Sequence, residues 1–167
     1  FKRSKVGIVG YGAIGKRTAQ LAKALGAEVM VHRLGGQREA DGLPVLALAD
    51  LLPRCDIISL HCPLTPATRG LIGARELAMM SANAILVNTA RGGLVDEAAL
   101  AQALHAGQIF AAGIDSFAQE PLPIHSALCA SDRVLLTPHI AGVTLQSARQ
   151  VALQTAQNII DFFQTKP

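Results

Sequence analysis

Short apolar runs alternate with amphipathic segments along the chain, and this alternation predicts strands separated by helices. The runs DIISL (56–60) and AILV (84–87) are almost continuously apolar, which is typical of parallel strands buried on both faces of a sheet. Repeated strand–helix–strand order favours an α/β fold, a doubly wound parallel sheet with helices on both faces and right-handed crossovers. Further strands are predicted at residues 5–9, 29–31, 111–114 and 134–136, and the run at 43–45 is compatible with one more.

The segments between the strands have helical periodicity and recognisable ends. Asp96 and Thr144 are good N-cap residues for the last two helices, while Gly26 and Gly107 are well placed to end two helices. The predicted helices span residues 14–25, 47–52, 74–80, 96–106 and 144–163. One face of the first helix carries Ile14, Thr18, Leu21, Ala22 and Leu25.

The composition is that of a globular protein large enough for one domain with a sizeable core. Of the 167 residues, 50% are hydrophobic and 16% are charged, while only 4% are aromatic. The core must therefore be built from Val, Ile, Leu and Ala. The net charge of +3 comes with no basic run and no interleaved aromatic residues, which argues against a nucleic-acid partner.

Cysteine spacing and apolar run lengths argue against metal, disulfide and membrane interpretations. Cys55, Cys62 and Cys129 are odd in number and have no metal-ligand spacing, so we expect no metal site and reduced thiols in a cytoplasmic protein. No apolar run approaches the ~18 residues of a membrane span, and no signal peptide is visible.

The glycine-rich segment GYGAIG follows the first predicted strand and leads directly into a helix, as a dinucleotide-binding loop requires. Gly10 permits the tight turn, Gly12 lets the backbone approach a pyrophosphate, and Gly15 lets helix and strand pack closely. Free N–H groups near Ala13 and Ile14, at the positive end of the helix dipole, would receive the phosphates. This context favours GYGAIG as the dinucleotide-binding loop of a Rossmann-type domain over a purely structural turn. Ligands of such domains bind at the carboxyl ends of the strands.

Three later loops each place reactive side chains just after a predicted strand. Arg91 lies in the first loop and can hold a carboxylate with two hydrogen bonds. Asp115 and Glu120 lie in the second, and His139 lies in the third. Taken singly, each has an ordinary explanation as a solvated, exposed or packed side chain. Together they make a carboxylate anchor and an acid-coupled proton donor beside a nucleotide.

In their order and spacing these segments resemble the nucleotide-binding domain of the D-isomer-specific 2-hydroxyacid dehydrogenase family. The resemblance covers residues 5–164, nearly the whole chain. Any one segment could arise by chance, whereas five in register are highly specific. The five are GYGAIG, DIISLHCPLTPATRGLIG (56–73), AILVNTARGGLVDEAAL (84–100), GIDSFAQEP (113–121) and TPHIAG (137–142).

The resemblance implies three catalytic residues. Arg91 matches the arginine that binds and orients the substrate carboxylate and keto group. His139 matches the proton donor to the carbonyl, and Glu120 matches the acid paired with that histidine. The implied reaction is hydride transfer between a nicotinamide and the keto carbon of a small 2-oxo acid, with Glu120 favouring the imidazolium.

The resemblance also implies a cofactor site. Asp115 matches the residue that receives the nicotinamide carboxamide, and Thr89 and Ala90 match positions near the nicotinamide ring. Ser116 departs from the commoner hydrophobic residue, with little expected consequence. The other matched cofactor positions are His61, Cys62 and Pro63 beside the ribose and phosphates, together with Thr68, Arg91, His139, Ala141 and Gly142.

Residues 1–167 are expected to form a dinucleotide-binding domain that lacks the family's substrate domain. The chain begins with Phe1 rather than Met, directly before a strand. We therefore expect the isolated chain to bind nucleotide but to turn over poorly, because domain closure completes the site. The choice among glyoxylate, hydroxypyruvate, lactate-type and phosphoglycerate-type substrates is expected to lie largely outside it.

Family members are commonly homodimers joined through this domain, so the resemblance implies a homodimer here. The apolar stretches 71–80 and 98–104 are candidates for that surface. Burial within the monomer explains each stretch equally well.

Two alternative functions remain open at this point. One is a formate or phosphite dehydrogenase relative, although Glu120 stands where the formate enzymes typically have an amide. The other is a non-catalytic dinucleotide sensor or corepressor. The intact set of Arg91, Glu120 and His139 favours an enzyme over that second alternative.

The end of the second predicted strand, in EVMVHRLGG, bears on the choice of cofactor. An acid that would bind the adenosine ribose of NAD is absent there, and Arg33 stands about 20 residues past the glycine loop. An arginine can pair with the 2′-phosphate of NADP and stack on the adenine. His32 and Arg38 could assist, and Gly35 and Gly36 leave space. We therefore predict NADP(H) as the favoured cofactor, with NAD(H) as the alternative if Arg33 points to solvent.

Overall fold

The computed structural model describes residues 2–33 and 39–164 and confirms the α/β fold. A six-stranded, fully parallel sheet has the order β2-β1-β5-β6-β7-β8. Its strands are β1 (Lys5–Val9), β2 (Glu28–His32), β5 (Ile57–Leu60), β6 (Ile85–Asn88), β7 (Ala111–Ile114) and β8 (Val134–Leu136). The predicted run at 43–45 belongs instead to a small antiparallel hairpin of β3 (Glu39–Ala40) and β4 (Leu43–Pro44).

The strand order reverses at β1, because β2 lies on one side of it and β5 on the other. In open α/β sheets such a reversal creates a crevice outside the carboxyl ends of the strands, where ligands bind. The loops after β1 and β5 lie side by side there, since the His61 amide donates to the Val9 carbonyl at 2.7 Å. The glycine loop is therefore placed at the reversal point.

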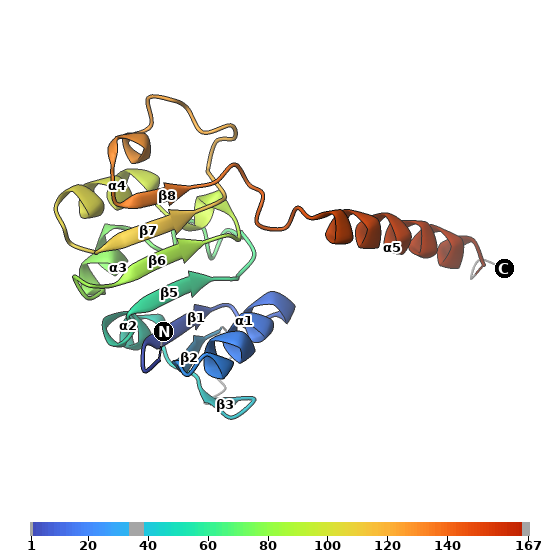
Figure 1. Cartoon of the computed structure of the whole chain (residues 1–167), viewed down its shortest axis with the longest axis horizontal. Helices are drawn as coiled ribbons and strands as arrows, with labels where there is room; N and C mark the ends of the chain where they lie inside the picture. Colours follow the sequence, from blue (N-terminus) through green and yellow to red (C-terminus); the bar gives the residue numbers. More distant parts are fainter. Residues whose placement is uncertain (1, 34–38, 165–167) are drawn as a thin grey trace.

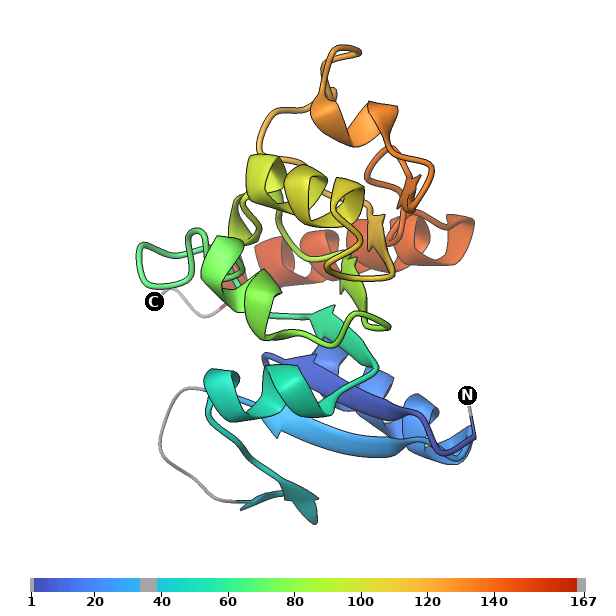
Figure 2. The ribbon, with the colours of Figure 1, turned by 90° about the vertical axis from the view of Figure 1, so that its left-hand side faces the viewer.

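Helices lie on both faces of the sheet. The helix α1 (Ala13–Ala24) packs over β1 and β2 on one face, while α2 (Leu48–Leu51), α3 (Ala74–Met79) and α4 (Glu97–His105) lie on the opposite face (Figures 1 and 2). Two buried clusters fill the layers. The larger cluster is dominated by Leu and Ile, and the smaller one beside α1 by Val and Ala. This agrees with the aromatic-poor core that the composition predicts.

The predicted helix ends are confirmed by their hydrogen bonds. The Asp96 carboxylate accepts from two backbone amides at the start of α4. The Thr144 hydroxyl accepts from the Ser147 amide at 3.0 Å at the start of α5 (Leu145–Gln164). Gly26 and Gly107 follow α1 and α4 with φ of 87° and 66°, a left-handed conformation that favours glycine.

The buried face of α1 differs from the predicted one. A Cβ on Gly15 would lie 2.1 Å from the Gly10 carbonyl oxygen, so the helix approaches the glycine loop very closely. Only small residues fit on that side, and the larger apolar residues are turned to solvent. The residues that α1 buries are Gly15, Ala19 and Ala22. The predicted apolar residues that are more than half exposed are Ile14, Leu21 and Leu25.

The last helix, α5, also departs from the expected layers. It extends away from the sheet (Figure 1), and none of its described residues is buried. The periodicity of the apolar residues predicts this helix correctly. It does not predict the helix position, because it indicates that an apolar face exists and not what covers that face. Within residues 2–33 and 39–164, no helix has the length and apolar character needed to cross a membrane.

Each of the two apolar stretches considered for a dimer surface buries large apolar side chains inside the monomer. Ile72 and Leu77 in the first stretch, and Leu100 and Leu104 in the second, are at most 1% exposed. The core of the monomer therefore explains their hydrophobicity. The homodimer implied by the family resemblance stays a prediction.

Candidate active site

The glycine loop between β1 and α1 offers bare backbone to a ligand. Gly10 has a φ of 95°, and a Cβ there would lie 2.6 Å from the backbone nitrogen of Cys62. A Cβ on Gly12 would meet nothing within 4 Å, so this side of the loop is open. Gly12 also begins α1 without a side-chain cap, which leaves the amides of Ala13 and Ile14 without an intrahelical partner. These features fit the pyrophosphate of a dinucleotide.

A cavity of about 330 Å³ lies beside this loop, at the reversal point of the sheet. Tyr11 and Leu71 also border it. The structure brings eight of the eighteen predicted cofactor positions together around this one cavity. Those that line it are Gly10, Gly12, His32, Arg33, His61, Cys62, Pro63 and Thr68.

Several side chains of the loop after β5 shape the cavity wall by bonding within the protein. The Thr68 hydroxyl donates to the Pro63 carbonyl at 2.7 Å. His61 pairs with the Ser59 hydroxyl at 2.9 Å, and burial lowers the pKa of its imidazole, so the ring is neutral at physiological pH. Burial also raises the pKa of the Cys62 thiol, which makes it an uncharged part of the wall. The loop therefore offers a ligand in this cavity mainly backbone and neutral groups.

The two basic residues at the end of β2, His32 and Arg33, differ in how much of each side chain is left to bind a ligand. Arg33 is half-buried and lines the cavity with the glycine loop. The Nδ1 atom of His32 lies 3.0 Å from the Leu46 carbonyl oxygen and must donate to it, so only Nε2 is left for a ligand. Arg38, Gly35 and Gly36, which were predicted to assist, lie outside the described residues.

An acidic residue near Arg33 escaped the sequence analysis. Asp41, in the turn of the β3–β4 hairpin, forms an ion pair with Lys16 at 2.8 Å and accepts from the Tyr11 hydroxyl at 3.1 Å. The hydrogen bonds from Lys16 and then Tyr11 hold the pKa of Asp41 below its usual value, and the charge of Arg33 adds to this. The hairpin therefore places a negative charge, already paired with Lys16, near the Arg33 end of the crevice.

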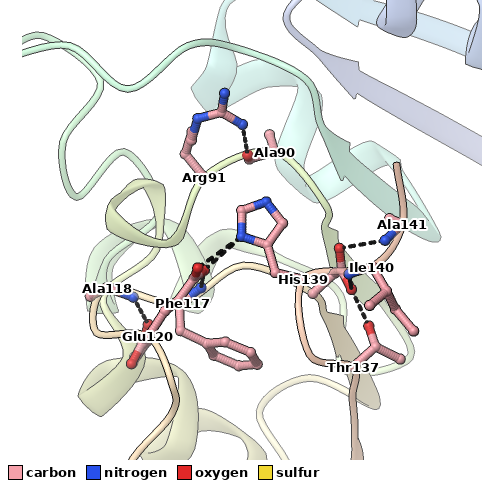
Figure 3. A network of polar contacts seen from close by, with 11 residues as sticks. Ala90, Arg91, Phe117, Ala118, Glu120, Thr137, His139, Ile140 and Ala141 are labelled. Atoms are coloured by element: carbon pink, nitrogen blue, oxygen red, sulfur yellow. Dashed lines mark hydrogen bonds and ion pairs between the residues drawn. The ribbon is translucent and has the colours of Figure 1, made fainter. Parts of the chain in front are cut away.

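The three predicted catalytic residues border a second cavity of about 310 Å³. His139 Nδ1 lies 2.8 Å from Glu120 Oε2, and the ring lies between Glu120 and Arg91 (Figure 3). Hydrogen bonds from His139 and from the Phe117 amide lower the pKa of Glu120, which is therefore ionised at neutral pH. With Nδ1 engaged, Nε2 of His139 is free to meet a substrate. The Arg91 guanidinium donates to the Ala90 carbonyl at 2.6 Å.

Asp115 directly follows β7, at the carboxyl end of the strand, and is 2% exposed. Its carboxylate accepts from the Thr137 hydroxyl and from the amides of Ile140 and Ala141. Thr89 and Asp115 line one further cavity together. Gly142 is the last predicted position, and its carbonyl accepts from a hydroxyl at the start of α5.

This geometry is matched by the comparison with known families. The model for the D-isomer specific 2-hydroxyacid dehydrogenase, NAD binding domain, matches residues 1–141. The chain belongs to this family. A curated relative, the glycerate dehydrogenase of Methylorubrum extorquens, is 46% identical over 166 residues, which are 98% of this chain. The chain spans about half the length of that relative, 51%.

Solved structures of dehydrogenases and reductases share the fold. The D-lactate dehydrogenase with NAD+ from Lactobacillus jensenii is 38% identical, with a TM-score of 0.81 over 87% of this chain and 48% of that one. An acyclic imino acid reductase, Bsp5, in complex with NADPH and D-Arg, is 28% identical, with a TM-score of 0.90 over 99% of this chain and 53% of that one. Proteins similar to this 2-hydroxyacid dehydrogenase domain thus hold either nicotinamide dinucleotide.

Four residues at the site of this dehydrogenase domain were missed by sequence reasoning. Each acts through a partner distant in sequence, so no local pattern points to it. The only sequence signal was proximity to a recognised segment: two of the four lie in or next to GYGAIG, and one begins TPHIAG. The four are Tyr11, Lys16, Asp41 and Thr137.

Ser116, the residue that departs from the family pattern, carries a buried hydroxyl without a hydrogen-bond partner among the described residues. Leaving such a group unpaired costs about 1–3 kcal/mol. We expect Ser116→Ala to raise the free energy of unfolding by about 1 kcal/mol, a rise in Tm of roughly 2–4 °C for a chain of this size. Thermal unfolding followed by circular dichroism measures it.

The matched control is Ser59→Ala, since Ser59 is also buried but its hydroxyl pairs with His61. This control should not gain stability. A lower Tm for Ser116→Ala than for the wild type would contradict the prediction and imply a partner such as buried water.

Proposed function

We propose that this chain is the dinucleotide-binding domain of an oxidoreductase that interconverts a small 2-oxo acid and the corresponding D-2-hydroxy acid. The observation that carries the proposal is the pairing of His139 with ionised Glu120 in a cavity that Arg91 also borders. A histidine held by a carboxylate and placed beside a guanidinium suits a carbonyl that carries a neighbouring carboxylate.

The three side chains have distinct parts in this proposal. Arg91 binds the substrate carboxylate and stabilises the charge that develops on the carbonyl oxygen. His139 delivers a proton from Nε2 to that oxygen, and Glu120 orients the imidazole ring through its contact with Nδ1. The nicotinamide, when bound, supplies the hydride for the keto carbon. Asp115 and the loop near Thr89 hold the nicotinamide ring in place.

The test uses the full-length protein with NADH, NADPH and a panel of small 2-oxo acids. We expect reduction of at least one member, seen as loss of absorbance of the reduced nicotinamide. Tight dinucleotide binding without turnover of any member would instead favour the sensor or corepressor alternative. Oxidation of formate or phosphite would favour the other alternative, which Glu120 argues against.

The proposal extends to the choice of cofactor, because Arg33 favours NADP(H) over NAD(H). A guanidinium that pairs with the 2′-phosphate adds a charge-assisted bond, so we expect NADPH to bind about tenfold or more tightly than NADH. Arg33→Ala should remove most of that difference by weakening NADPH alone. Fluorescence titration of both nucleotides measures it, with Arg75→Ala, an exposed arginine on α3, as the matched control. Equal or tighter NADH binding to the wild type would defeat the NADP preference.

A further inference from the structure

The loop that presents His139 holds it in a conformation that this residue does not favour. His139 has a φ of 54°, in the left-handed region. For a residue other than glycine such a conformation is unfavourable and persists only where the surrounding structure imposes it. Something in the fold must therefore hold the segment that follows β8.

The Asp115 carboxylate is the group that brackets this residue. One oxygen accepts from the Thr137 hydroxyl at 2.5 Å and from the Ile140 amide at 2.9 Å, and the other accepts from the Ala141 amide at 2.9 Å. Thr137 precedes His139 in sequence, and Ile140 and Ala141 follow it; all four residues are labelled in Figure 3. The loop is thus pinned on both sides of the strained position.

An ionised carboxylate at Asp115 is suited to holding the loop around His139. Burial opposes its ionisation, but the hydrogen bonds from Thr137, Ala141 and Ile140 outweigh burial and lower the pKa of the carboxyl below its usual value. Charged acceptors form the stronger hydrogen bonds. An ionised carboxylate offers about four acceptor positions, of which three are used here, so one remains for a further donor.

We propose that Thr137 and Asp115 form a clamp that positions His139, and that a nicotinamide carboxamide bound to Asp115 tightens the same clamp. Thr137 is a positioning residue, because it acts through Asp115 rather than on the substrate. The second half rests on the proposed function, since it needs a nicotinamide as the fourth donor. Cofactor binding would then be communicated to the proton donor through one side chain.

The clamp is tested first without any cofactor. Thr137→Val removes the hydroxyl at nearly constant shape, and Thr137→Ser keeps it. In the full-length protein we expect amide hydrogen exchange in the peptide that covers 138–142 to become about tenfold faster in Thr137→Val, and to stay within about twofold of the wild type in Thr137→Ser. Thr155→Val, on the exposed α5, controls for the same chemical change. Equal exchange in all variants, or a serine variant as fast as the valine one, overturns the clamp.

The coupling is tested by adding the reduced dinucleotide. Binding should slow exchange at 138–142 in the wild type, and Thr137→Val should lose at least half of this protection. The same variant should lower kcat about tenfold while the nucleotide dissociation constant changes less than threefold. Binding that leaves 138–142 unchanged in the wild type overturns the coupling. Failure of the wild type to bind any nicotinamide overturns the proposed function instead, and the clamp is then decided by the cofactor-free exchange.

Discussion

His139→Ala is expected to lower turnover of the full-length enzyme by about 10²- to 10⁴-fold and to leave nicotinamide affinity within a few-fold of wild type. The reason is that His139 borders the second cavity while its Nδ1 is held by Glu120, an arrangement that the proposed function uses for proton transfer and not for holding the dinucleotide. Steady-state kinetics and nucleotide titration on the same preparations measure the two quantities. His105→Ala, an exposed histidine at the end of α4, is the matched control.

Arg91→Ala should give a loss of similar size, with a larger share in KM because the substrate carboxylate loses its anchor. Arg91→Lys should restore only part of the activity, since an ammonium keeps the charge but not the paired donors of a guanidinium. Turnover near the wild-type value in both His139→Ala and Arg91→Ala would sink these assignments.

The strands and helices could be predicted because each depends on a local pattern. The periodicities of the apolar residues locate all six strands of the sheet, and Gly26 and Asp96 mark helix ends by backbone and capping chemistry that acts over a few residues. The buried face of α1 could not be predicted in this way. The contact between Gly15 and Gly10 decides it, and that contact exists only in the folded turn.

The residues of the candidate site could also be predicted only where they depend on a local sequence pattern. Arg91, Glu120 and His139 are found from sequence because each follows a strand within a recognisable segment, and parallel strands bring such ends together. Asp41 is not found, because it reaches the glycine loop through a hairpin whose placement no local pattern specifies. For Asp115 the sequence suggests a ligand contact, and the structure adds three bonds inside the protein that no alternation of apolar residues could reveal.

Gly92 lies where the loops after β6 and β7 pack against each other, so a substitution there affects both folding stability and the active-site geometry. We expect Gly92→Ala to be the most damaging single methyl addition near the site. A Cβ on Gly92 would lie 1.8 Å from the Phe117 carbonyl carbon and 2.0 Å from its oxygen. Both contacts are with backbone, so relief requires the segment at 117–118 to move. That segment also positions Glu120, whose Oε1 accepts from the Phe117 amide at 2.9 Å. The expected result is a loss of about 3 kcal/mol or more in the free energy of unfolding, together with impaired turnover.

Gly93→Ala is the matched control, because the two glycines are adjacent and both lie in the turn that follows Arg91. A Cβ on Gly93 would meet the tip of the Leu64 side chain at 3.1 Å, which a small rotation relieves. We expect this variant to stay within about 1 kcal/mol of the wild type and Gly92→Ala to fall by roughly 6–12 °C in Tm. Equal melting temperatures for the two variants would show that the loops after β6 and β7 can separate freely. In that case the close packing at Gly92 could not be what sets the distance between Arg91 and the Glu120–His139 pair.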